Sequence, residues 1–194
     1  MKSILILAFF FSAFCVQAQQ KPTDLDKSPM DMSYWPANYP ILKMSGKAKD
    51  MPVARVIYGR PLKNGRIIFV GIIKDNDVWS LGANEATEIE FFRNVKISGK
   101  PVPKGRYTLF CYPAENKWTM ILNRDNYSWG SFTYDNKKDV LRTDIDTEKN
   151  TDTVEALTIY FDETKTGANM IFLWDDLKAV LPIAIAADDP VMPV

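Results

Sequence analysis

Residues 105–112 read Gly-Arg-Tyr-Thr-Leu-Phe-Cys-Tyr, and this stretch decides the fold class. Bulky side chains occupy both sets of alternate positions, with Tyr107 and Leu109 in one set and Phe110 and Tyr112 in the other. Because successive side chains of a strand point to opposite faces of the sheet, both faces of this segment are expected to be buried. The pattern therefore predicts a central strand.

Short apolar, β-branched and aromatic runs recur from Ala54 onward, separated by Gly, Pro, Asn and Asp. This spacing is typical of β-sandwiches and barrels. The expected strands are residues 54–58, 66–73, 87–97, 105–112, 117–123, 140–146, 154–161, 169–174 and 178–185. No long amphipathic helical pattern occurs, and only residues 135–139 suggest a short surface turn of helix. We predict an all-β, antiparallel, sandwich-like single domain.

The N-terminal segment has the pattern of a secretory signal peptide. Lys2 precedes an apolar run over residues 4–14, and Val16 and Ala18 fit the small-residue cleavage pattern. The run is shorter than the roughly 18 residues that span a bilayer. The alternative is a lipid attached to Cys15, but the bulky Phe14 stands where lipidation needs a small residue. We expect export to the periplasm or beyond, with cleavage after Ala18.

Prolines at 22, 29, 36, 40 and 52 set residues 19–52 apart from the rest of the chain. Repeated prolines disfavour a regular helix or a central strand. Three aromatic residues lie among them, so residues 33–42 are expected to rest on the domain as an ordered arm. The predicted organisation is a signal peptide at 1–18, an arm at 19–52, a β domain at 53–187 and a tail at 188–194.

The composition excludes several classes of protein. The chain has 24 basic and 24 acidic residues, so neither nucleic acid nor an anionic membrane is an implied partner. It has no histidine, which excludes Ser-His and Cys-His nucleophile pairs and imidazole metal sites. Loss of Cys15 with the signal peptide would leave Cys111 without an internal disulfide partner. Cys111 lies in an apolar strand pattern, which favours a buried, unreactive thiol over a nucleophile.

The remaining motifs for metals and phosphates fail. The segment from Asp75 opens like a calcium loop, but Ser80 and Ala86 stand where the EF-hand needs Gly and Glu. Neither a Walker motif nor a Gly-x-Gly-x-x-Gly run is present. We therefore predict no metal, no cofactor and no catalytic residue.

Carboxylates are the acid–base groups that remain for a hydrolase. Glu88 and Glu90 alternate with apolar residues, so we interpret them as the solvated face of a half-buried strand. Glu85 differs, because it follows Gly82-Ala83-Asn84 in a loop. Asn84 and Glu85 are interpreted either as a hydrogen-bonded brace of that loop or as part of a ligand site.

Aromatic residues with polar companions are the other candidates for binding. One group combines Trp79 with Arg60, Asn84 and Glu85, and a second places Trp129 near Arg142. Exposed aromatic faces beside polar groups bind sugars and peptides. Packing in the core is the competing interpretation for Trp79, and it is the favoured one for Trp118 and Trp174.

Six blocks of the sequence together resemble a family of exported Bacteroidetes proteins, the domain-of-unknown-function 2911 family. They are Tyr58-Gly59-Arg60-Pro61, Arg66-Ile67-Ile68-Phe69, residues 78–87 with Gly-Ala-Asn-Glu-Ala-Thr, residues 105–109, Trp129-Gly130, and residues 139–142. The resemblance runs from about Ser28 to Ile183. It implies an envelope or secreted protein of a Gram-negative bacterium, and it implies no activity.

Three functional hypotheses follow. The first is a non-catalytic domain that binds a small polar ligand, a saccharide or peptide end, near Arg60, Trp79, Asn84 and Glu85. The second is a hydrolase that uses Glu85 and a second acid such as Glu88 across one cleft. The third is a structural or partner-binding envelope component that contacts its partner through residues 33–42.

The signal-peptide interpretation predicts that the exported protein begins at Gln19. N-terminal sequencing of protein from the periplasm or medium checks this. Incorporation of labelled palmitate, with a blocked N-terminus at Cys15, would show the lipoprotein alternative instead.

Overall fold

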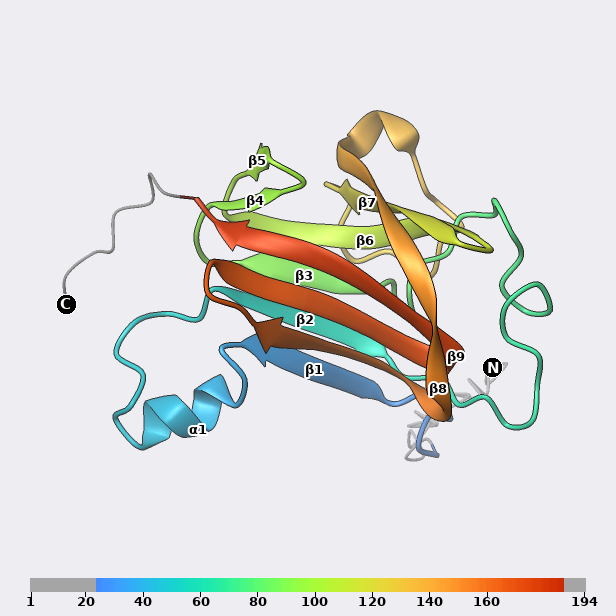
Figure 1. Cartoon of the computed structure of the whole chain (residues 1–194), viewed down its shortest axis with the longest axis horizontal. Coiled ribbons are helices and arrows are strands. Elements are labelled where there is room, and N and C mark those ends of the chain that lie inside the picture. Colours follow the sequence, from blue (N-terminus) through green and yellow to red (C-terminus); the bar gives the residue numbers. More distant parts are fainter. Residues whose placement is uncertain (1–23, 187–194) are drawn as a thin grey trace, which may run out of the picture.

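The computed structural model describes residues 24–186, which form one antiparallel sheet of nine strands (Figure 1). The predicted signal peptide and C-terminal tail lie outside these residues. The strand order is β1-β2-β3-β6-β7-β8-β9-β4-β5. The strands are β1 Met30–Trp35, β2 Ala54–Gly59, β3 Glu88–Phe91, β4 Val95–Ile97, β5 Lys100–Val102, β6 Gly105–Ala114, β7 Lys117–Asn123, β8 Asp139–Glu163 and β9 Gly167–Ile185. The all-β prediction is confirmed.

The segment that decided the fold class, β6, lies between β3 and β7, as a central strand does. Leu109 and Cys111 point into the main core, and Phe110 points the other way into a smaller cluster with Ala86 and Ile121. Both faces of β6 are therefore buried. The alternation of bulky side chains predicted this correctly, because a strand covered on both sides has no solvated face to mark with polar residues.

Strands β8 and β9 form a long ribbon that folds over the first strands (Figure 1). The sequence predicted two strands in place of each, and the predicted breaks fall where the ribbon bends. The β8–β9 register shifts between Lys149 and Val154, and Asp175 has a φ of 56°. The ends of β9 meet as a result, since a Cβ built on Gly167 would lie 2.0 Å from the carbonyl oxygen of Ile183.

The expected strand at residues 66–73 is wrong. Both Asn64 and Gly65 have positive φ, and the carbonyl of Ile68 then accepts hydrogen bonds from the N–H groups of Ile72 and Ile73. The chain thus coils on itself instead of pairing with a neighbour. The expected strand at 87–97 is also divided, into β3 and β4.

The prolines of residues 19–52 do not exclude a helix, contrary to the prediction. Helix α1 spans Tyr39–Met44, with Pro40 in its first turn. The first turn tolerates proline because its N–H groups have no partner within the helix. Residues 30–35 form β1, an edge strand paired only with β2. The short helical turn expected at 135–139 is present as η1, Asn136–Lys138.

Aromatic rings fill the core between the β8–β9 ribbon and the strands that it folds over. The Trp79 ring lies 5.7 Å from that of Trp118 and 6.0 Å from that of Trp174, centroid to centroid. Phe69 contacts all three. Near the other end of the core, Trp35 of β1 stacks on Phe161 of β8. The packing interpretation of Trp118 and Trp174 is confirmed, since both are buried.

Side chains and one short backbone bridge, between Leu62 and Ala156, pair with the outer edge of β8. The hydroxyl of Tyr58 accepts a hydrogen bond from Ile159 N, and Ser33 Oγ donates one to Ile159 O. Arg60 donates to the carbonyl of Leu157 and to Thr158 Oγ1. These contacts satisfy backbone groups that a sheet edge leaves open.

Replacing Tyr58 with Phe should therefore destabilise the fold. Tyr58 is 1% exposed, so the N–H of Ile159 would lose its partner in a site that water does not reach. We expect a loss of about 1–3 kcal/mol in the free energy of unfolding, measured by urea denaturation. Tyr160→Phe is the control, because the Tyr160 hydroxyl makes no hydrogen bond within residues 24–186. Equal stability of the two variants would show that the Tyr58–Ile159 hydrogen bond does not stabilise the fold.

Candidate functional site

The Gly82-Ala83-Asn84-Glu85 loop lies between the end of β2 and the start of β3. Thr87 holds its base, since its N–H donates to Ser80 O and its hydroxyl donates to Leu81 O. The loop packs so closely on β2 that a Cβ on Gly59 would lie 2.1 Å from the carbonyl oxygen of Ala83. The position of this loop is therefore fixed by backbone contact.

A second segment, residues 128–130, pairs with the same loop. Ala86 N donates to Ser128 O at 2.9 Å, and Gly130 N donates to Asn84 O at 2.7 Å. Glu85 and Trp129 face each other in an antiparallel bridge. Two of the sequence blocks that resembled one family thus meet in space, although more than 40 positions separate them.

The larger pocket beside this loop has a volume of about 440 Å³, and we call it the tryptophan pocket. Trp79 and Trp174 line it, and the Trp79 indole N–H donates to Gly82 O at 3.1 Å. Gly82 and Ala83 form one wall, and Pro61 and Ile73 also line it. The aromatic pair is thereby held rigidly, with part of the Trp79 ring exposed.

Charged side chains stand at the edge of the tryptophan pocket. Arg66 is held by hydrogen bonds from its guanidinium to the carbonyls of Leu62 and Lys63, neither of which neutralises its charge. Lys74 and Asp77 are exposed and make no side-chain hydrogen bond or ion pair within residues 24–186. The edge thus carries two cations and one anion.

These three charged residues were not among the predicted site residues. Arg66 was placed in an expected strand, and Asp77 belonged to the rejected calcium loop. No local signal could have found them, because their convergence depends on the coiling of residues 66–73 against Trp79.

The predicted constellation of Arg60, Trp79, Asn84 and Glu85 is spread over three places. Only Trp79 lines the tryptophan pocket. Arg60 braces β8 and pairs with Asp31 at 3.0 Å. Asn84, with a φ of 65°, supplies its carbonyl to Gly130, and Glu85 lines a second, smaller pocket on the other side of the loop.

Trp129 and Arg142, the second predicted group, have separate surroundings. Trp129 is 59% exposed. Arg142 donates to Asp139 at 2.7 Å and to the Tyr134 hydroxyl at 2.8 Å, and it stacks over Tyr112. Its hydrogen bond to Asp139 raises the Arg142 pKa, while burial and the same carboxylate raise the pKa of Tyr134. Both groups stay protonated, so this cluster has the character of a structural brace.

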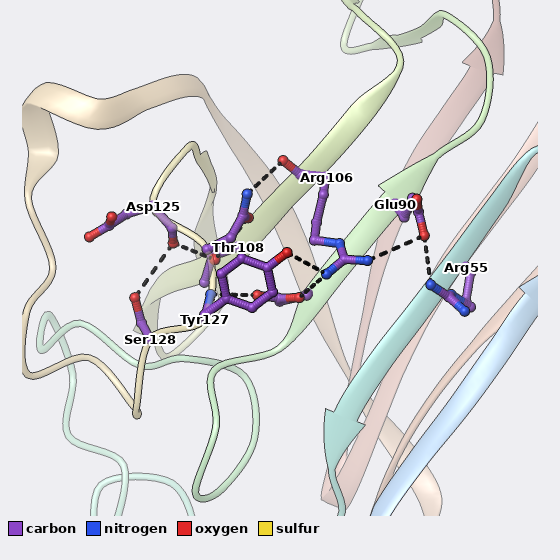
Figure 2. Close-up of polar contacts among 9 residues, drawn as sticks. Arg55, Glu90, Arg106, Thr108, Asp125, Tyr127 and Ser128 are labelled. Atoms are coloured by element: carbon purple, nitrogen blue, oxygen red, sulfur yellow. Dashed lines mark hydrogen bonds and ion pairs between the residues drawn. The ribbon is translucent and has the colours of Figure 1, made fainter.

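Glu88 and Glu90 belong to a row of charges across β2, β3 and β6 (Figure 2). Glu90 accepts a hydrogen bond from Arg55 at 2.7 Å and lies 3.8 Å from Arg106. Glu88 accepts the backbone N–H of Tyr127 at 2.6 Å and lies 3.6 Å from Arg106. Their placement on an outer strand face agrees with the sequence interpretation, but the oxygens are used by protein donors.

The structure offers no group of three His, Cys, Asp or Glu residues that could hold a metal ion within residues 24–186. The same residues contain no helix of the length and apolarity that a membrane span needs. Cys111 is fully buried, and this burial raises the pKa of its thiol well above the ordinary value.

We therefore expect Cys111 to be inert in the folded protein at neutral and mildly alkaline pH. A thiol of raised pKa forms little thiolate, and the core also excludes the reagent. Titration of the mature protein with a chromogenic disulfide should give no reaction until guanidinium is added. Rapid reaction of the native protein would show that the core opens at β6.

The protein is thus a β-sheet domain with an aromatic pocket beside a glycine loop, and contacts with β2 and residues 128–130 hold that loop in place. Residues 42–183 match a family described as protein of unknown function (DUF2911), and the chain belongs to that family. The suspected resemblance is confirmed. No curated protein and no solved structure matches the chain.

Proposed function

We propose that this protein is an exported, non-catalytic binding domain, and that the tryptophan pocket holds a small polar ligand. The observation that carries the proposal is the half-buried Trp79, which stacks on the core residue Trp174, donates to the Gly82 carbonyl and lines a pocket of about 440 Å³. Concave sites with apolar walls and a few convergent polar groups are the usual form of small-ligand sites.

The charged residues at the edge of the tryptophan pocket indicate which class of ligand would bind there. Arg66 and Lys74 favour a carboxylate, because an ionised acceptor makes the strongest hydrogen bonds with these donors. Asp77 adds an acceptor for a hydroxyl or an amide N–H. A peptide C-terminus and an acidic saccharide both combine a carboxylate with such donors, and both carry surfaces that pack on an indole ring.

The other two hypotheses receive less support. Glu85 and Glu88 do line one pocket, as a hydrolase would require, but Glu88 is held by the Tyr127 N–H and by Arg106. Residues 33–42 belong partly to β1 and α1, so they are built into the sheet. Their deletion would remove an edge strand as well as a contact surface, which makes that test unsuitable.

The proposal predicts that Lys74→Gln weakens binding of a carboxylate ligand by about tenfold, through loss of one charge-assisted hydrogen bond. The Lys74 side chain is exposed and makes no hydrogen bond or ion pair within residues 24–186, so the variant should keep its stability. The measurement is a thermal-shift screen of the mature protein with uronic acids and short peptides, followed by calorimetric titration of any compound that raises the melting temperature. A ligand at 100 times its Kd adds about 2.7 kcal/mol.

Lys165→Gln is the matched control, because Lys165 is equally exposed and lies in the turn between β8 and β9. C-terminally amidated peptides and neutral sugars serve as ligand controls. The proposal fails if Lys74→Gln and Lys165→Gln bind alike, or if amidation of the peptide changes nothing.

A further inference from the structure

The second pocket lies on the outer face of the sheet, across the glycine loop from the tryptophan pocket. It has a volume of about 210 Å³, and we call it the glutamate pocket. Met30 of β1, Ile57 of β2 and Ala86 form its apolar walls. Glu85, Glu88, Tyr127 and Ser128 complete it.

The two carboxylates of this pocket are in different states. Glu88 is engaged by the Tyr127 N–H and by Arg106. Glu85 is exposed, and its carboxylate has no hydrogen-bond or ion-pair partner within residues 24–186. The backbone around Glu85 is nevertheless rigid, because both neighbouring residues are hydrogen-bonded to the 128–130 segment. An unpaired carboxylate thus extends from a fixed backbone beside apolar walls.

This combination fits a cation on an apolar stem. Two carboxylates disfavour an anion, and the free carboxylate of Glu85 is best paired by a cation. The described residues offer no cluster that would hold a metal cation instead.

Lysine fits the site better than arginine. A lysine has four methylene groups that pack on Met30, Ile57 and Ala86, and a compact ammonium that one carboxylate satisfies. The planar guanidinium of arginine gains most from bidentate pairing combined with stacking on an aromatic ring, and Arg106 already lies over the Tyr127 ring beside this pocket.

The exposed apolar surface around the glutamate pocket is larger than a small amine would cover. Tyr127 and Phe132 are 81% and 88% exposed, and Trp129 pairs with Glu85. Phe132 lies against Gly130, so it belongs to the same surface. Met32 is exposed next to Met30 on the same face of β1. Exposed aromatic residues and methionine around a central pocket are characteristic of protein interfaces.

We propose that the glutamate pocket binds a lysine side chain of a partner polypeptide, with Glu85 pairing the ammonium and the exposed aromatic residues contacting the flanking chain. This site is separate from the tryptophan pocket and would act whether or not that pocket binds a ligand. Its charge preference is also opposite, since one site takes a cation and the other an anion.

The test is a calorimetric titration of the purified protein with the blocked peptide acetyl-Gly-Phe-Lys-Phe-Gly-amide and with the same peptide acetylated on the lysine Nζ. Acetylation should weaken binding by about tenfold or more, because it removes the charge. Glu85→Gln should weaken binding of the unmodified peptide to a similar extent. Glu85 is exposed, and near-ultraviolet circular dichroism will verify that the variant is folded.

Two control variants separate the glutamate pocket from other sites. Glu115→Gln removes an exposed carboxylate at the β6–β7 turn and should bind like the unaltered protein. Lys74→Gln alters only the tryptophan pocket and should also bind the lysine peptide normally.

The proposal is overturned if no peptide binds, if acetylation has no effect, or if Glu85→Gln and Glu115→Gln behave alike. Pentane-1,5-diamine distinguishes a small amine from a polypeptide. Tighter binding of the peptide than of the diamine supports a polypeptide partner, whereas equal or tighter binding of the diamine would overturn that part of the proposal.

Discussion

The outer edge of β8 is the constraint on which the rest of the structure depends. One side of β8 pairs with β9, and the backbone groups of residues 155–159 on its other side need further partners. Tyr58, Ser33 and Arg60 supply such partners together with the backbone of residues 61–63, so the β8–β9 ribbon stays in place over the aromatic core. Tyr58 lies in β2, and Arg60 directly follows β2. Their contacts therefore also fix the end of β2, where the segment that leads to the glycine loop begins.

The glycine loop then separates two pockets whose surrounding charges differ in sign. Its Gly82 and Ala83 side faces the indoles of the tryptophan pocket, with Arg66 and Lys74 at the edge. Its Glu85 side faces Met30 and Ile57 on the outer face of the sheet. Contact with Gly59 and pairing with residues 128–130 hold the loop between them, so the backbone shared by the two pockets is fixed.

Local pattern and through-space contact contributed differently to what could be predicted. Strands β6 and β7 were predicted to within two residues, because the alternation of side chains is a local property. Residues 66–73 have the composition of a strand but do not form one, because hydrogen bonds to the carbonyl of Ile68 coil the chain on itself. Helix α1 was excluded by a rule about proline that does not apply in a first turn.

The sequence by itself determined the all-β class, the family, the absence of imidazole chemistry and the burial of Cys111. Each of these rests on residue type or on a period of two, which the sequence displays directly. Only the tertiary structure decided that Trp79 and Glu85, six positions apart, serve different pockets, and that Arg66 and Lys74 join Trp79. The physical reason is that a loop's two sides are defined by what packs on them, here Gly59 and Ser128, which lie far away along the chain.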